Sequence, residues 1–282
     1  MANATLGATS NPSEGTLRSY LGLILSLPGG DSYIGSDTQT SDINRAYEKT
    51  AYVHDWPQML IRLGIVITAN VDRYPLPTGF RKFHHLKVEG IRFDETELDV
   101  LKRSRRKFAI DRNVSQFILS NFPSTASTAF TLSNSETAAS AVTIELDTIS
   151  GLSQYDEIWV DAATEADEEF TLVSSVDSDN TTITARLRAA KAASDILYRV
   201  REIIDIYFYR NVVLLSAASD TMLIPDELDF SVAHLAAYYA YSRLEDFTSA
   251  KEHLAIWEND VQKAFLASDA QSTGAVGQFV LG

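Results

Sequence analysis

The residues of this chain that could do chemistry are a GDS triplet, five histidines and an acidic turn. The triplet lies in GGDSYIG at 29–35, and a serine in such a loop acts as a nucleophile only when an aspartate and a histidine activate it. No Asp-x-x-His pair follows near the C-terminus, so we expect a loop between two helices here. We assign no catalytic residue and predict that the protein is not an enzyme.

Metal ligation is no better supported by the sequence. His84 and His85 are adjacent, and neighbouring side chains on a strand point to opposite faces, so we do not expect them to share an ion. DSDN at 177–180 lacks the glycine and the distal glutamate of a calcium loop, which favours a hairpin turn. The spacing typical of a metal-binding helix is also missing among the other histidines, His54, His234 and His253. We predict no metal site and no cofactor.

Charge is distributed unevenly along the 282 residues, whose formal net charge is -14. Between Asn113 and Ala185 there is no lysine or arginine, whereas twelve acidic residues fall there. The rest of the chain holds all 24 basic residues and the remaining 26 of the 38 acidic ones, so it is nearly neutral. Proteins that grip nucleic acid accumulate lysine and arginine, which argues against that task here. Two compositions joined in one chain indicate an insertion.

Apolar residues at helical spacing occur on both sides of the acidic stretch. They predict helices over 16–27 and 41–56, and a third helix after Pro225 that is apolar on two faces. SAKE at 249–252 is a capping box that predicts the start of a further helix. A helix with two apolar faces needs cover on both, and we expect its own domain to cover one and a neighbouring subunit the other. The subunit-interface candidates are Leu228, Val232, Leu235, Tyr239, Tyr241 and Leu244.

Alternating β-branched and polar residues predict the strands. The runs at 63–77 and 83–93 are typical of hairpins, and ELDVL at 97–101 predicts a short strand. Similar short runs recur through the acidic stretch and predict a small all-β sandwich or barrel. We therefore predict an α+β protein with a discontinuous, mainly helical core domain carrying short β hairpins (1–121 and 202–270), an inserted acidic all-β module (122–201) and a flexible C-terminal arm (271–282).

Two segments are candidates for docking to another protein. KRSRRK at 102–107 places five positive charges in six residues. Such a run is either a solvated face or a patch for an acidic protein surface, with DNA phosphate as the weaker alternative. The C-terminal arm ends in apolar residues that would be unfavourable in water. The docking candidates are Lys102, Arg103, Arg105, Arg106, Lys107, Phe279, Val280 and Leu281.

Five segments occur in an order that belongs to a known pattern: SDINRAYEKTAYVHDWPQMLI, ITANVDRYPLPTGFRKFHHLKVEG, REIIDIYFYRN, SDTMLIPDELDFSVAHLAAYYAYSRLED and SAKEHLAIWENDVQKAF. A YPLP hairpin and an LIP before a helix rich in alanine and tyrosine are its main features. In this order the chain resembles the head-to-tail adaptor, or connector, proteins of tailed bacteriophages, of the short-tailed phage type. The acidic stretch departs from the pattern, because simpler members carry only a short hairpin there.

The resemblance implies a structural virion protein that forms a homo-oligomeric ring of about twelve copies. The ring would join the portal to the tail and extend the channel through which DNA enters and leaves the capsid without specific binding. Its partners would be itself, the portal protein and the tail nozzle or other tail proteins, with no membrane. Assembly would take place in the host cytoplasm, and the docking candidates above would meet the portal or the tail.

The residues alone leave a second class of function open. An oligomeric surface protein could bind a glycan through the β module, with Trp159 in EIWVD as a sugar platform. A soluble hydrolase is a third and weaker alternative.

Overall fold

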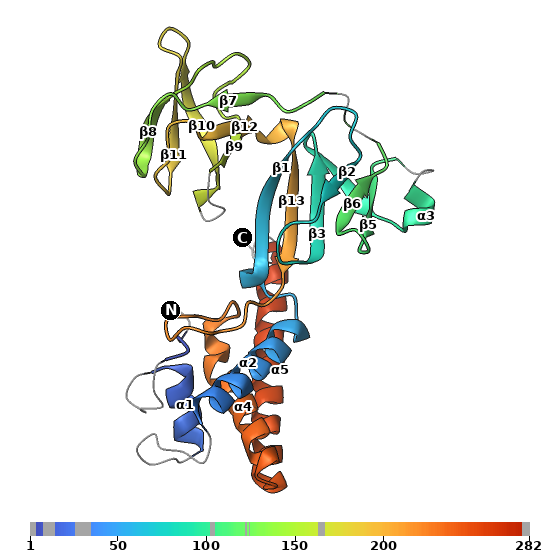
Figure 1. Ribbon diagram of the computed structural model, residues 1–282, viewed down its shortest axis with the longest axis vertical. Helices are drawn as coiled ribbons and strands as arrows, with labels where there is room; N and C mark the ends of the chain where they lie inside the picture. Colours follow the sequence, from blue (N-terminus) through green and yellow to red (C-terminus); the bar gives the residue numbers. More distant parts are fainter. Residues whose placement is uncertain are drawn as a thin grey trace. The chain divides into compact units, whose positions relative to one another are not determined.

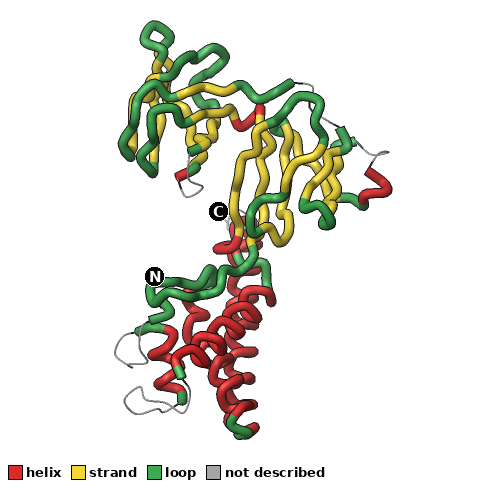
Figure 2. Tube along the Cα trace, viewed as in Figure 1, coloured by secondary structure: helices red, strands yellow, loops and turns green. Residues whose placement is uncertain are grey.

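A computed structural model of the chain describes residues 4–7, 15–25, 35–101, 105–121, 123, 125–162 and 167–277. The chain forms two compact units. Residues 1–60 and 210–282 form a helical unit, and residues 61–209 form a β unit that carries the sheets (Figure 1, Figure 2).

Within its described residues, the helical unit is built from α1 (Leu17–Ile24), α2 (Ser36–Val53), α4 (Asp229–Arg243) and α5 (Phe247–Gly277). Short 3-10 turns occur at Pro57–Met59 and at Asp226–Leu228. Helix α4 is the centre of this unit, because α1, α2 and α5 all pack against it. Its middle is accordingly poor in polar side chains and almost completely buried.

Two helices begin at residues other than the predicted ones. Helix α2 begins at Ser36, before the predicted start at Ser41. Helix α5 begins at Phe247, because the Asp246 carboxylate accepts hydrogen bonds from the backbone N–H and the hydroxyl of Ser249. Ser249 therefore lies inside the helix and is not its N-cap.

The C-terminal part of α5 also differs from the prediction of a flexible arm from residue 271. The helix continues to Gly277, so residues 271–277 are helical. The predicted docking residues Phe279, Val280 and Leu281 lie outside the described residues.

A seven-stranded sheet occupies one part of the β unit. Its spatial order is β1-β13-β3-β4-β5-β6-β2, and β4 pairs with β5 in parallel. Its core is rich in aromatic residues, among them Phe83, Phe108, Phe117 and Phe208. The strands are β1 (Leu60–Val66), β2 (Arg73–Pro75), β3 (Phe80–Val88), β4 (Ile91–Glu95), β5 (Lys107–Asp111), β6 (Gln116–Leu119) and β13 (Ile203–Arg210).

A six-stranded sheet contains the acidic part of the chain. Its spatial order is β7-β12-β9-β10-β11-β8, and a bridge between Leu132 and Leu146 brings its two outer strands together. The sheet thus curls around its own apolar core, which includes Phe130, Ile144 and Val160. The strands are β7 (Ala129–Thr131), β8 (Ala139–Glu145), β9 (Glu157–Asp161), β10 (Glu169–Asp177), β11 (Thr182–Leu187) and β12 (Ile196–Arg199).

The prediction of a mainly helical core domain with an inserted β module was wrong. The protein is mostly β, with two curled sheets and 32% helix. Segments predicted as separate hairpins join one continuous sheet, because β13 pairs between β1 and β3 although it lies far from both in sequence. ELDVL also forms a short helix, α3 (Leu98–Leu101), instead of a strand. Local alternation indicates strands, but it contains no information on such distant pairing.

Candidate functional site

The predicted subunit-interface residues lie mostly inside the helical unit. The buried members are Leu228, Val232 and Leu235, the partly buried ones are Tyr239 and Tyr241, and the exposed one is Leu244. Helices α1, α2 and α5 of the same unit pack around α4 and cover both of its apolar faces. The chain itself therefore buries most of the surface that we expected a neighbouring subunit to cover, and a subunit contact through Tyr239, Tyr241 and the exposed Leu244 stays a prediction.

Exposed apolar side chains gather instead beside the end of α2. Tyr52 and Val53 are the last residues of that helix, and Val213 and Leu214 lie in the segment that follows β13. All four are exposed, with Val213 at 69% and Leu214 at 54%. We call these four residues the apolar patch.

Hydrogen bonds hold the two parts of the apolar patch together. The Val212 N–H donates to Tyr52 Oη over 3.4 Å. Asn44 lies about two helical turns before Tyr52 on α2. The Leu215 N–H donates to Asn44 Oδ1 over 2.8 Å, and Asn44 Nδ2 donates to the Leu215 carbonyl over 2.9 Å. The segment 212–215 is thus bound to α2 at both of its ends, and the exposed Val213 and Leu214 lie between these two points.

The basic run is only partly described. Lys102 and Arg103 lie outside the described residues, whereas Arg105 and Arg106 are exposed on the turn before β5. Lys107 forms an ion pair with Asp94 over 3.0 Å. Two exposed arginines therefore remain as docking candidates in the described part of this run.

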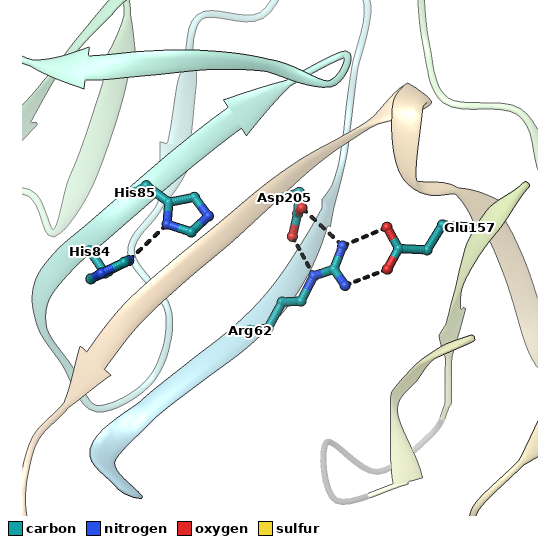
Figure 3. Close-up of polar contacts among 5 residues, drawn as sticks. All are labelled: Arg62, His84, His85, Glu157 and Asp205. Atoms are coloured by element: carbon teal, nitrogen blue, oxygen red, sulfur yellow. Dashed lines mark hydrogen bonds and ion pairs between the residues drawn. The ribbon is translucent and has the colours of Figure 1, made fainter. Parts of the chain in front are cut away.

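A partly buried ion-pair cluster joins the two sheets of the β unit (Figure 3). Arg62 on β1 donates from Nε and one terminal nitrogen to Asp205 on β13, over 2.9 and 3.0 Å. Its terminal nitrogens also donate to both oxygens of Glu157 on β9, over 2.5 and 3.0 Å. The Asp205 side chain is 2% exposed, that of Arg62 22% and that of Glu157 40%. One guanidinium thus makes two bidentate contacts, one within its own sheet and one to the other sheet.

Hydrogen bonds in this cluster favour the charged forms of Arg62 and Glu157. Burial opposes the charge of Arg62, but the hydrogen bonds to Glu157 and Asp205 outweigh it and raise the pKa of the guanidinium above its ordinary value. The same hydrogen bond lowers the pKa of Glu157, against the effect of burial. Phe170 and Tyr207 add their ring faces, with centroids 3.8 and 5.2 Å from the guanidinium carbon.

Close packing beside the cluster also fixes the contact between the two sheets. A Cβ added to Gly64 on β1 would lie 2.4 Å from the ring of Trp159 on β9, so only glycine fits there. Trp159 is 3% exposed and stacks between Phe170 and Tyr198. A ring buried in this way offers no face to a sugar, which removes the proposed platform of the glycan-binding alternative.

His84 and His85 come together, contrary to the expectation that they point apart. Their Nδ1 atoms are 2.8 Å apart (Figure 3). The His85 ring also stacks on Tyr207 with centroids 3.9 Å apart. Burial lowers the pKa of His85, and the charges of His84 and Lys87 lower it further. Over the described part of the chain, no group of three or more metal-ligating side chains is found.

Asp229, the first residue of α4, is a buried carboxylate in the helical unit. One of its oxygens accepts a hydrogen bond from the Ala4 N–H, which ties the N-terminal segment to this helix. Burial raises the pKa of Asp229 to about 6, although that hydrogen bond acts in the opposite direction. The segment is held further by Leu6, whose N–H donates to the Asp220 carbonyl over 2.8 Å and whose side chain is buried.

The Arg62 cluster was not predicted from the sequence, although two isolated charges in apolar runs pointed to it. Arg62 is the single charge in LIRLGIV, an apolar run at 60–66 that forms β1 and overlaps the start of the predicted hairpin at residue 63. A charge in such a run needs a buried partner of opposite sign, and EIIDIYF contains one in Asp205. That Glu157 would complete the cluster could not be inferred, because it depends on how the two sheets meet.

Comparison of the chain with models of known protein families gave no match, and comparison with curated proteins gave no significant match either. Among the described helices, none is both long enough and apolar enough to cross a membrane.

Proposed function

We propose that this chain is a structural protein that assembles with copies of itself into a ring, and that the ring is the connector between portal and tail of a tailed bacteriophage. The observation that carries the proposal is the apolar patch on the helical unit. The resemblance in the order of sequence segments supplies the identity of the assembly.

The apolar patch has the properties of a subunit contact. The hydrogen bonds of Asn44 and Tyr52 fix the backbone on either side of Val213 and Leu214, so docking would cost little backbone entropy there. About half of each side chain is exposed, and burying the remainder would contribute about 3–6 kcal/mol. Such a patch can form the apolar centre of an interface, and a ring buries one copy of it for every subunit.

The acidic, six-stranded sheet fits the periphery of such a ring. Residues 113–185 include twelve acidic side chains and no lysine or arginine. Arg62 pairs with Glu157 and Lys191 with Glu169, but the excess of negative charge still repels its copies, and salt screens this repulsion only beyond about 8 Å. The outer rim separates the copies most. The Arg62 cluster would keep this sheet fixed to the seven-stranded sheet, as a connector under mechanical load requires.

Size-exclusion chromatography with light scattering tests the proposal, with and without purified portal protein. The expected result is a ring-sized species, at least in the mixture, and its loss in a Val213→Asp/Leu214→Asp variant. Val114→Asp is the matched control, because Val114 is equally exposed but lies in the β unit. A chain that stays monomeric with portal, or a double variant that assembles like the control, would contradict the proposal.

A further inference from the structure

Two histidines meet at the contact between α4 and α5. His234 on α4 and His253 on α5 have their Nδ1 atoms 2.9 Å apart, their ring centroids lie 5.1 Å apart and their ring planes are inclined by 27°. His234 is buried and His253 partly buried. At this distance one Nδ1 must carry a hydrogen and the other must accept it, so the contact is a hydrogen bond between two different tautomers.

Apolar and aromatic groups enclose this pair. The Phe230 ring stands edge-on to His234, with centroids 4.8 Å apart, and Tyr241 stacks on His253 at 5.3 Å. From α1, Tyr20 packs on Phe230. None of these rings carries a negative charge at neutral pH that could balance a charged imidazole.

The carboxylates near the pair are engaged elsewhere or lie at its edge. Asp260 on α5 accepts a hydrogen bond from the Ser231 hydroxyl over 2.9 Å and pairs with Lys263 over 3.5 Å. Glu252 neighbours His253 on the exposed side of α5. Burial lowers the pKa of both histidines, and the charge of His253 lowers that of His234 further; Asp260 and Glu252 only partly offset this.

We propose that His234 and His253 form an acid-sensitive clasp between α4 and α5. The neutral pair shares one N–H···N hydrogen bond, and the first proton added can still be shared between the two Nδ1 atoms. A second proton places two N–H groups and two positive charges against each other in the contact between α4 and α5. The helices must then separate, which exposes buried apolar side chains of α5 such as Val261.

The sign of the pH dependence follows from proton counting. In the unfolded chain both histidines bind protons near pH 6.5, whereas the folded pair binds one proton fewer. Because the folded-state pKa values are lowered, the stabilisation is present above about pH 6.5 and is lost as the pH falls below it. For one proton, the unfolding equilibrium constant rises about tenfold for each pH unit.

Unfolding of the full chain, followed by the far-UV circular dichroism of its helices in urea at pH 6.5 and 5.5, tests the clasp. In His253→Asn the amide can make the same hydrogen bond without titrating. We expect the unfolding constant of the wild type to rise up to about tenfold more than that of the variant over this interval. His54→Asn is the control, because His54 lies in the same unit but stands edge-on to Trp56 and Phe265 and contacts neither member of the pair. This variant should behave as the wild type does.

Equal pH dependence in the wild type and in His253→Asn would overturn the proposal. Should the variant not fold, imidazole NMR of the wild type gives the same answer. Two separate titration steps at the His234–His253 pair are expected, the second below the ordinary range of a histidine. Independent titration of both rings near pH 6.5 would refute the clasp.

Discussion

Replacing Arg62 with methionine removes the charge that Asp205 and Glu157 share while it keeps most of the volume. The Asp205 carboxylate, 2% exposed, is then left buried and uncompensated. Breaking such a pair costs about 3–5 kcal/mol, and because Arg62 is itself 22% exposed we expect a loss of about 3 kcal/mol. Glu157→Gln should cost only about 0.5–1 kcal/mol, since that carboxylate is 40% exposed and can be solvated.

Urea unfolding followed by tryptophan fluorescence measures these losses, because Trp159 lies at the same junction. Adding Asp205→Asn to the Arg62→Met variant should recover about 1–2 kcal/mol, since it removes the unpaired charge. The reasoning would be refuted if Arg62→Met cost less than about 1 kcal/mol, or if the double variant were less stable than the single one.

Other predictions concern packing, a buried carboxylate and the basic run. Gly64→Ala should destabilise the β unit by about 2 kcal/mol or more in urea unfolding, because the added Cβ would overlap the Trp159 ring. An unchanged stability would show that the Trp159 ring moves aside without cost. The pKa of Asp229 is about 6 when folded against 3.8 ordinarily, so its stabilising contribution is complete below pH 4 and is lost as the pH rises through 6. Asp229→Asn should thus raise the free energy of unfolding by about 1–2 kcal/mol at pH 8 and by nothing at pH 4; equal effects at both would contradict this. Arg105→Glu/Arg106→Glu should weaken co-sedimentation with portal or tail proteins at low salt, whereas unchanged binding would leave this run a solvated face.

Helices could be predicted from the sequence better than the sheets. The apolar spacing placed α1, α2 and α4 approximately, because helical hydrogen bonds are local and the pattern repeats within a few residues. The helix starts were less certain: Asp246 caps α5 where the capping box indicated Ser249. Local spacing also did not show that α1, α2 and α5 pack on α4, because it contains no information on which helices of the same chain meet.

Features that depend on distant residues could not be predicted. That β13 lies between β1 and β3, and that this makes the protein mostly β, is a matter of pairing across more than a hundred residues. The contact between His84 and His85 depends on ring rotation toward Tyr207, which strand alternation does not contain. The same limit applies to the His234–His253 contact, since it requires α5 to fold back on α4.

The mass of the assembled species tests the central claim most directly. Light scattering of the purified chain with portal protein, supported by negative-stain electron microscopy, should give a closed ring of many copies that the Val213→Asp/Leu214→Asp variant fails to form. A monomer in the presence of portal, with the helical unit folded by circular dichroism, would contradict the proposal that this protein is a connector.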